Sequence, residues 1–152
     1  MSNKKPLIAY IEDDAMLLTM YEQLFTIHGF SFVGARDFES GAKMIKEKNP
    51  DVILLDMLLP DKMKWVPTEL NVSYGLDLLS EIKKNPATKN TPVIILSNMD
   101  ESAIVNEAKE RGADDYMIKA HVLPKEVLAK VREILGARGI EIPCDPIKEK
   151  CE

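Results

Sequence analysis

Short apolar runs alternate along this sequence with longer segments in which apolar residues recur at every third or fourth position. A short unbroken apolar run with β-branched members is typical of a strand that is buried on both faces. Recurrence at every third or fourth position is typical of an amphipathic helix. The runs that predict strands cover residues 6–11, 30–35, 52–55, 92–96 and 116–118.

The helical segments between these runs have recognisable ends. Glycine adopts the left-handed backbone that closes a helix, and proline lacks the N–H group that would continue one. The predicted helices accordingly end at Gly29, Asn49-Pro50, Asn85-Pro86, Gly112 and Gly136. We expect Asp37 and Asp100 to cap the second and fourth helices. The third helix is expected to start near Gly75, and Pro124 to lie in the first turn of the fifth.

Five strands that alternate with five helices predict an α/β fold. The expected architecture is a five-stranded, doubly wound parallel sheet in the flavodoxin-like order 2-1-3-4-5, with helices on both faces. We assign residues 1–136 to this domain and residues 137–152, which are charged, to a C-terminal tail. Segment 61–74 has no clean period and contains the only tryptophan, Trp65, so we interpret it as a long inserted surface loop between the third strand and the third helix.

Composition narrows the class of protein. A chain of 152 residues fits one domain with a full core. Its net charge of −5 argues against nucleic acid as the main partner. No apolar stretch is long enough to cross a membrane and no secretion signal precedes the first strand, so we expect a cytoplasmic protein. Cys144 and Cys151 are then expected to be free thiols rather than metal ligands.

Polar residues follow the predicted strands at their carboxyl ends. Glu12 and Asp13 follow the first strand, and Asp56 directly follows the third. Because parallel strands end at one edge of the sheet, and the first and third strands are neighbours, these carboxylates should lie close together. A hard divalent cation such as Mg²⁺ relieves their mutual repulsion. Asp14, next in the chain, is better explained as the cap of the first helix.

A hydroxyl and a cation complete the edge. Ser97 ends the fourth strand and Lys119 follows the fifth. An aspartate can act as a nucleophile that forms an aspartyl phosphate, and Mg²⁺, an ammonium and a hydroxyl would neutralise or bind the phosphoryl oxygens. We therefore predict Asp56 as the phosphate acceptor, with Ser97 and Lys119 as its catalytic partners.

Four short motifs at these strand ends follow one another in an order that one protein family shares. They are Ile11-Glu12-Asp13-Asp14, Leu54-Leu55-Asp56-Met57-Leu58-Leu59-Pro60, Ile95-Leu96-Ser97-Asn98 and Gly112-Ala113-Asp114-Asp115-Tyr116-Met117-Ile118-Lys119. Over about residues 6–136 the sequence resembles the receiver domain of two-component response regulators. The resemblance implies that a histidine kinase phosphorylates Asp56 and that Lys119 contacts the phosphoryl group.

The resemblance also implies a metal site and a switch. Mg²⁺ would be held by Glu12, Asp13, Asp56 and the backbone carbonyl of Leu58. Ser97 and Tyr116 would form the switch pair that reports phosphorylation to the surface formed by the fourth helix, the fifth strand and the fifth helix.

The sequence departs from the family at three places. Ala120 follows Lys119 where the family usually has a proline, often after a cis bond, so this bond is either trans with a reshaped loop or a store of strain. Segment 61–74 is longer than is usual. Leu58 and Met99 are apolar at positions that are often polar and flank the approach of the hydrolytic water, which predicts a long-lived aspartyl phosphate.

The leading interpretation is a stand-alone receiver domain that switches protein–protein interactions and is not an enzyme. Residues 137–152 are too few for a DNA-binding output domain, so we expect no DNA or membrane partner. The expected partners are a sensor histidine kinase and either a downstream protein target or a histidine phosphotransfer protein. The chain is expected to be a monomer or a phosphorylation-dependent dimer. The alternatives are a phosphorelay intermediate, a Mg²⁺-dependent phosphatase of similar fold, which would carry Asp-x-Asp after its first strand, and an unphosphorylated binding module.

Overall fold

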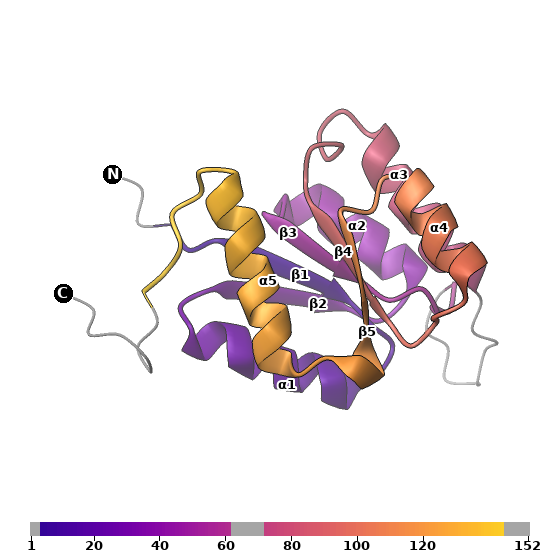
Figure 1. Cartoon of the computed structure of the whole chain (residues 1–152). Coiled ribbons are helices and arrows are strands. Elements are labelled where there is room, and N and C mark those ends of the chain that lie inside the picture. The colour runs from indigo at the N-terminus through magenta and orange to yellow at the C-terminus, as the bar shows by residue number, and fades with distance from the viewer. Residues whose placement is uncertain (1–3, 62–71, 145–152) are drawn as a thin grey trace.

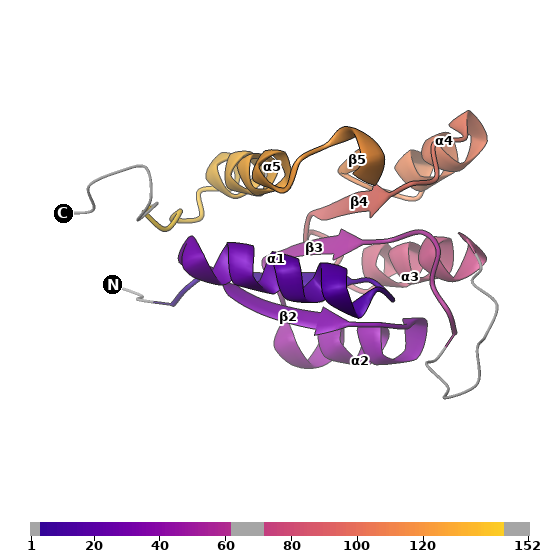
Figure 2. The same cartoon turned by 90° about the horizontal axis from the view of Figure 1, so that it is seen from below.

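A parallel five-stranded sheet forms the centre of the molecule. The computed structural model describes residues 4–61 and 72–144. The strands pair in the order β2-β1-β3-β4-β5, and every pairing is parallel. Their carboxyl ends therefore share one edge, and in Figure 2 the visible arrowheads point the same way. The predicted fold class is confirmed, with strands at β1 Leu7–Ile11, β2 Ser31–Ala35, β3 Val52–Leu55, β4 Val93–Ser97 and β5 Asp115–Ile118.

Helices cover both faces of this sheet (Figure 1). Residues on alternate positions of each strand point to opposite faces, and all four residues of β3 are buried, as expected of a central strand. One hydrophobic cluster joins the sheet to the first and last helices, and a second joins it to the other three. The helices are α1 Ala15–Ile27, α2 Phe38–Lys48, α3 Val72–Lys84, α4 Ser102–Glu110 and α5 Pro124–Ala137, with a short 3₁₀ turn, η1, at Lys119–His121.

Several helix ends lie where the sequence predicted them. Asp14 caps α1 by accepting hydrogen bonds from the backbone N–H groups of Met16 and Leu17, and Asp37 caps α2. The residues predicted to end the first, second and fourth helices include three with positive φ: Gly29 at 91°, Asn49 at 48° and Gly112 at 106°.

The start of α3 was predicted too late. The helix begins at Val72 rather than near Gly75. Val72 and Tyr74 pack against the core, and the Tyr74 ring lies 6.1 Å from the Phe38 ring of α2. Apolar contact therefore extends the helix into residues that we assigned to the inserted loop. The rest of that loop, residues 62–71 with Trp65, lies outside the described residues.

Two further helix ends differ from the prediction. The cap of α4 is Glu101, not Asp100, because the Glu101 carbonyl accepts the N–H groups of Ile104 and Val105. Helix α5 continues past Gly136 to Ala137, and Gly139 takes the left-handed backbone instead, with φ of 73°.

The prediction of a free thiol at Cys144 was also wrong. Cys144 is disulfide-bonded. The prediction rested on an expected cytoplasmic location, where thiols are usually reduced. Cys151 lies outside the described residues.

Gly75 determines how closely α3 approaches the segment after β3. A Cβ atom at this position would lie 2.4 Å from the carbonyl oxygen of Met57, closer than real atoms approach. Only glycine lets the helix lie directly against the backbone next to Asp56. Helix α3 thus packs directly against the turn that follows β3 and carries Asp56.

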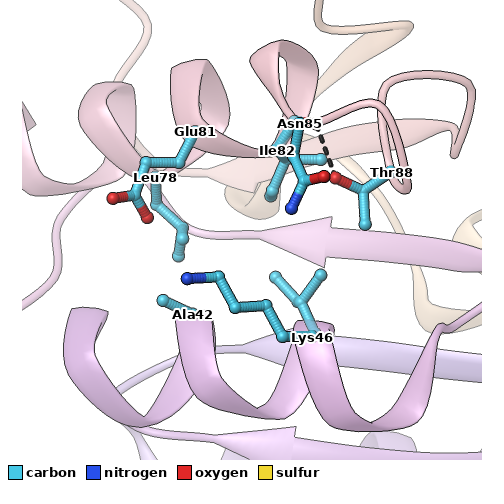
Figure 3. Close-up of a pocket in the computed structure, with 8 residues that line it drawn as sticks. Ala42, Lys46, Leu78, Glu81, Ile82, Asn85 and Thr88 are labelled. Carbon is cyan, nitrogen blue, oxygen red and sulfur yellow. Dashed lines mark hydrogen bonds between the residues drawn. The ribbon is translucent and has the colours of Figure 1, made fainter.

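A pocket between α2 and α3 lies apart from the predicted site (Figure 3). It is lined by apolar side chains with Lys46 and Glu81 among them, and the Thr88 hydroxyl at its side donates to the Ile82 carbonyl. None of the predicted site residues lines it. The pocket is therefore separate from the carboxyl edge of the sheet, where those residues lie.

Candidate functional site

The carboxyl edge brings the predicted charged residues together. Glu12 and Asp13 follow β1, Asp56 follows β3 and Lys119 follows β5. Glu12, Asp13 and Asp56 each offer a carboxylate oxygen, and these oxygens all lie within 4.8 Å of one another. Glu12 and Asp56 are buried at 2% and 4% exposure, whereas Asp13 is half-buried. The cluster is therefore enclosed but accessible from the side of Asp13.

This donor set fits Mg²⁺. Hard oxygen ligands at close range suit a small divalent cation that keeps several waters. Among the described residues, three carboxylates lie together and Lys119 is the ammonium in contact with two of them, so negative charge is in excess where the dielectric is low. When bound, a Mg²⁺ ion would neutralise this charge and the charge of phosphoryl oxygens.

Lys119 connects the two buried carboxylates. Its Nζ donates to Asp56 Oδ2 at 3.1 Å and also contacts Glu12 Oε2. Burial acts to lower the pKa of Lys119, but the carboxylates of Asp56 and Glu12 outweigh it, so the pKa is raised and the ammonium stays charged. The cation predicted from the sequence is thus already in contact with the predicted acceptor.

The surroundings of Glu12 disfavour its charged form. Burial and the neighbouring charge of Asp56 raise its pKa to about 8, and Lys119 opposes part of that rise. Its Oε1 accepts the N–H of Asp14 at 3.2 Å. A cation in the cluster would favour the ionised form.

Two residues that sequence reasoning missed support the acidic pair. The hydroxyl of Tyr10 donates to Glu12 Oε2 at 3.1 Å. The guanidinium of Arg36, just after β2, donates two hydrogen bonds to the Asp13 carbonyl, at 3.0 and 2.8 Å. Tyr10 was predicted only as part of an apolar strand, although it and Glu12 lie two residues apart and so on one face. No sequence signal pointed to Arg36.

The predicted switch pair lies on the last two strands, with Ser97 at the end of β4 and Tyr116 in the neighbouring β5. We call the residues Glu12, Asp56 and Lys119 the charged side, and Ser97 and Tyr116 the hydroxyl side. Ser97 is fully buried, and its Oγ accepts the N–H of Met99 at 3.2 Å.

Tyr116 bonds to the same residue of the loop after β4. Its hydroxyl donates to the carbonyl of Met99, and burial raises its pKa, with the Ser97 hydroxyl opposing that rise. The two hydroxyls are therefore both bound to the β4–α4 loop, and their role as a switch stays a prediction.

The loop after Lys119 begins with the short 3₁₀ turn that contains Ala120. No peptide bond among the described residues is cis, so the Lys119–Ala120 bond is trans. The Ala120 N–H, which a proline would lack, donates to Asn98 Oδ1 at 2.9 Å. Of the two alternatives for this bond, the structure has the trans form.

Leu58 lies beside the acceptor. Its N–H donates to Asp56 Oδ1 at 3.3 Å, and its side chain is half-buried, as is that of Met99. This contact places the Leu58 backbone next to the acidic cluster. Its carbonyl as a metal ligand stays a prediction.

Comparison with known proteins agrees with this geometry. Residues 8–132 match the response regulator receiver domain family. The chain belongs to the response regulator receiver family. A curated relative is the phosphate regulon transcriptional regulatory protein PhoB of Escherichia coli, 30% identical over 128 residues that cover 84% of this chain and 51% of that protein. The receiver chain thus spans about half the length of the curated relatives it matches.

Solved structures of receiver domains have the same fold. The Francisella response regulator 1452 receiver domain aligns with a TM-score of 0.71 and 28% identity, covering 89% of this chain and 99% of that one. A CheY-like receiver domain protein from Methanospirillum hungatei aligns with a TM-score of 0.76 and 23% identity, covering 90% and 98%. None of the helices in the described part of this receiver is long and apolar enough to cross a membrane.

Proposed function

We propose that this receiver domain accepts a phosphoryl group on Asp56 from a sensor histidine kinase, with Mg²⁺ held by Glu12, Asp13, Asp56 and the Leu58 carbonyl. The observation that carries the proposal is the contact of Lys119 with both Asp56 and Glu12 beside three clustered carboxylates. Nucleophile, cation and metal ligands occupy one edge of the sheet, where an incoming phosphoryl group would meet all of them.

The transfer needs few steps from the protein. An oxygen of Asp56 attacks phosphorus, the phosphorus–nitrogen bond of a phosphohistidine breaks, and the imidazole nitrogen keeps the electron pair. The step needs no separate nucleophile or base from the protein, because the attacking oxygen belongs to the carboxylate of Asp56 itself. Lys119 then exchanges its hydrogen bond with Asp56 for one with a phosphoryl oxygen. We therefore propose a phosphoacceptor that assists its own phosphorylation and dephosphorylation rather than an enzyme acting on a separate substrate.

The signal would leave through the hydroxyl side. A phosphoryl group on Asp56 adds acceptor oxygens near Ser97, and the Ser97 hydroxyl would turn toward them. This movement would release the Met99 N–H and disturb the loop that also accepts the hydroxyl of Tyr116. The β4–α4 loop is thus the element through which phosphorylation would change the surface.

We propose that the output is a change in protein–protein contacts, with no direct DNA contact by this domain. The net charge of −5 supports this, because DNA would repel it. The curated relatives are named as transcriptional regulators, and those names refer to proteins about twice as long as the matched region. The family match gives no support to the phosphatase alternative, and strand β1 is followed by Glu-Asp-Asp rather than Asp-x-Asp.

Intact mass spectrometry tests the proposal. The chain is incubated with acetyl phosphate and Mg²⁺, and we expect a gain of one phosphoryl group that chelation of Mg²⁺ prevents. Asp56→Asn should gain none, whereas Asp77→Asn, a change at an exposed carboxylate of α3, should be phosphorylated like the wild type. A wild-type chain that gains no mass would refute phosphorylation at this site.

The two forms of output differ in where the phosphoryl group goes. Mixing the phosphorylated chain with a histidine phosphotransfer protein should leave the group on Asp56 if the domain is a terminal switch. Loss of the group to the phosphotransfer protein would instead establish the phosphorelay alternative.

A further inference from the structure

Tyr10 carries a polar group into the otherwise apolar interior beneath the acidic cluster. It lies on β1 with no exposed surface, and its ring meets the Tyr21 ring edge-on at 5.4 Å. A buried hydroxyl is unfavourable unless it is hydrogen-bonded. The hydroxyl of Tyr10 donates to Glu12 Oε2, at 3.1 Å. A phenylalanine would fill the same space in the core without this bond, so the hydroxyl is the part of Tyr10 that packing does not explain.

Three donors converge on the carboxylate of Glu12. The N–H of Asp14 reaches Oε1, and the hydroxyl of Tyr10 and the ammonium of Lys119 reach Oε2. These donors belong to the loop after β1, to β1 itself and to the residue after β5. Two of them are fixed by the fold, whereas the long Lys119 side chain is able to change partners.

When Lys119 changes its hydrogen-bond partner, Glu12 Oε2 needs another donor. In the proposed phosphotransfer, Lys119 turns toward the phosphoryl oxygens and its contact with Glu12 weakens. The hydroxyl of Tyr10 is rigidly placed by the strand and by the packed ring, so it stays on Glu12 Oε2 throughout. The orientation of Glu12 toward the metal then does not depend on where Lys119 is.

We propose that Tyr10 is a positioning residue, whose buried hydroxyl holds the Glu12 carboxylate in the orientation in which it binds Mg²⁺. The inference rests on the proposed function only in taking this cluster as the Mg²⁺ site. Groups that hydrogen-bond a metal's ligands orient them, and their loss typically weakens metal binding by about 10–100-fold. Tyr10 would act in this way from inside the core.

The test compares two tyrosines of one aromatic cluster. Tyr10→Phe removes the hydroxyl that reaches Glu12, and Tyr21→Phe removes a hydroxyl that is not bonded to Glu12 from a residue that is also buried, at 4% exposure. The dissociation constant of Mg²⁺ is measured by titration calorimetry without any phosphodonor. We expect Tyr10→Phe to bind Mg²⁺ about tenfold more weakly and Tyr21→Phe to bind it like the wild type.

A second readout separates positioning from general structural damage. The rate of phosphorylation by acetyl phosphate is measured against Mg²⁺ concentration. For Tyr10→Phe we expect the curve to shift to higher Mg²⁺ with an unchanged plateau, because saturating Mg²⁺ compensates for weaker binding. Combining Tyr10→Phe with Glu12→Gln should weaken Mg²⁺ binding no further than Glu12→Gln alone, since the partner of the hydroxyl has changed.

Defined outcomes would overturn the inference. They are unchanged Mg²⁺ affinity in Tyr10→Phe, an equal loss in Tyr21→Phe, a lowered plateau, or additive losses in the double variant. These results are distinct from failure of the proposed function. A wild type that binds Mg²⁺ but is never phosphorylated would refute phosphate acceptance, while the calorimetric comparison would still decide the role of Tyr10.

Discussion

The charged side and the hydroxyl side of this site are held together in different ways. On the charged side, Lys119 contacts Glu12 and Asp56 directly, so each group is fixed by opposite charge in a buried setting. On the hydroxyl side, Ser97 and Tyr116 are hydrogen-bonded to the backbone of Met99 in the β4–α4 loop. Loops are in general more mobile than helices and strands. A hydrogen bond to a charged group is worth about 1.5–3 kcal/mol and one between neutral groups about 1 kcal/mol, so the contacts of the hydroxyl side cost less free energy to break. This difference agrees with the proposed function, in which the charged side carries out the phosphotransfer and the hydroxyl side reports it.

Replacing the cation should have the largest effect. In Lys119→Met, the rate of phosphorylation by acetyl phosphate should fall by about 10²–10³-fold, because a donor to the developing phosphoryl charge is lost. Mg²⁺ should still bind, since the three carboxylates remain. Stopped-flow assays and calorimetry measure the two quantities. Lys130→Met is the matched control, because Lys130 pairs with Asp115 and Glu133 away from the site. A wild-type rate in Lys119→Met would contradict the division between the two sides.

The second largest effect is expected at Gly75, where α3 packs against the backbone next to Asp56. In Gly75→Ala, the added Cβ would meet the Met57 carbonyl, and overpacking of this kind lowers the free energy of unfolding by about 2 kcal/mol. The loss should appear although alanine is the better helix former. Gly136→Ala, where the Cβ meets only the end of the Ile142 side chain at 3.3 Å, should not destabilise the protein. Urea unfolding of both variants measures the difference; equal stabilities would show that α3 moves away without loss.

The lifetime of the aspartyl phosphate tests Leu58 and Met99, the two apolar side chains at positions that are often polar in the receiver family. Leu58 and Met99 cannot orient an attacking water, so the Leu58→Asn, Met99→Glu double variant should lose its phosphoryl group roughly tenfold faster, which corresponds to about 1.4 kcal/mol in the barrier. Decay is followed by intact mass after the phosphodonor is removed. An unchanged decay rate would refute the prediction.

The smallest effect is expected from a change confined to the hydroxyl side. Tyr116→Phe removes one hydrogen bond to the Met99 carbonyl, which is worth about 1 kcal/mol. Mg²⁺ affinity and phosphorylation rate should stay at wild-type values, because the charged side is intact. Hydrogen exchange in the β4–α4 loop should instead become faster before phosphorylation and respond less to it. A slowed phosphorylation would show that the two sides are not separable.

Much of the fold followed from the sequence because its signals were local. The apolar run 52–55 predicted a buried strand, and Gly29, Asn49 and Gly112 predicted helix ends through backbone conformations that these residues favour. The errors arose where tertiary contacts decide. Tyr74 packs on Phe38 and lengthens α3, and Ile140 packs on the core while its N–H bonds to the Leu135 carbonyl, which moves the end of α5 past Gly136.

The site divided in the same way. Its charged residues could be predicted, since parallel strands bring their carboxyl ends to one edge and the residues after those ends are visible in the sequence. The contacts of Tyr10 and Arg36 could not be predicted, because each depends on how a side chain is oriented in the folded protein. Whether a strand tyrosine reaches a carboxylate depends on side-chain direction, and the Arg36 partner is a backbone carbonyl, which every residue has.

The hydrogen bond between Ala120 and Asn98 joins the loops that follow the last two strands. Asn98 lies directly after Ser97, and Ala120 directly after Lys119, so this bond links the loop after β4 to the turn after β5. A proline at position 120 has no N–H group and would remove the bond. The alanine therefore gives the carboxyl edge a cross-link between two loops that a proline would leave unjoined.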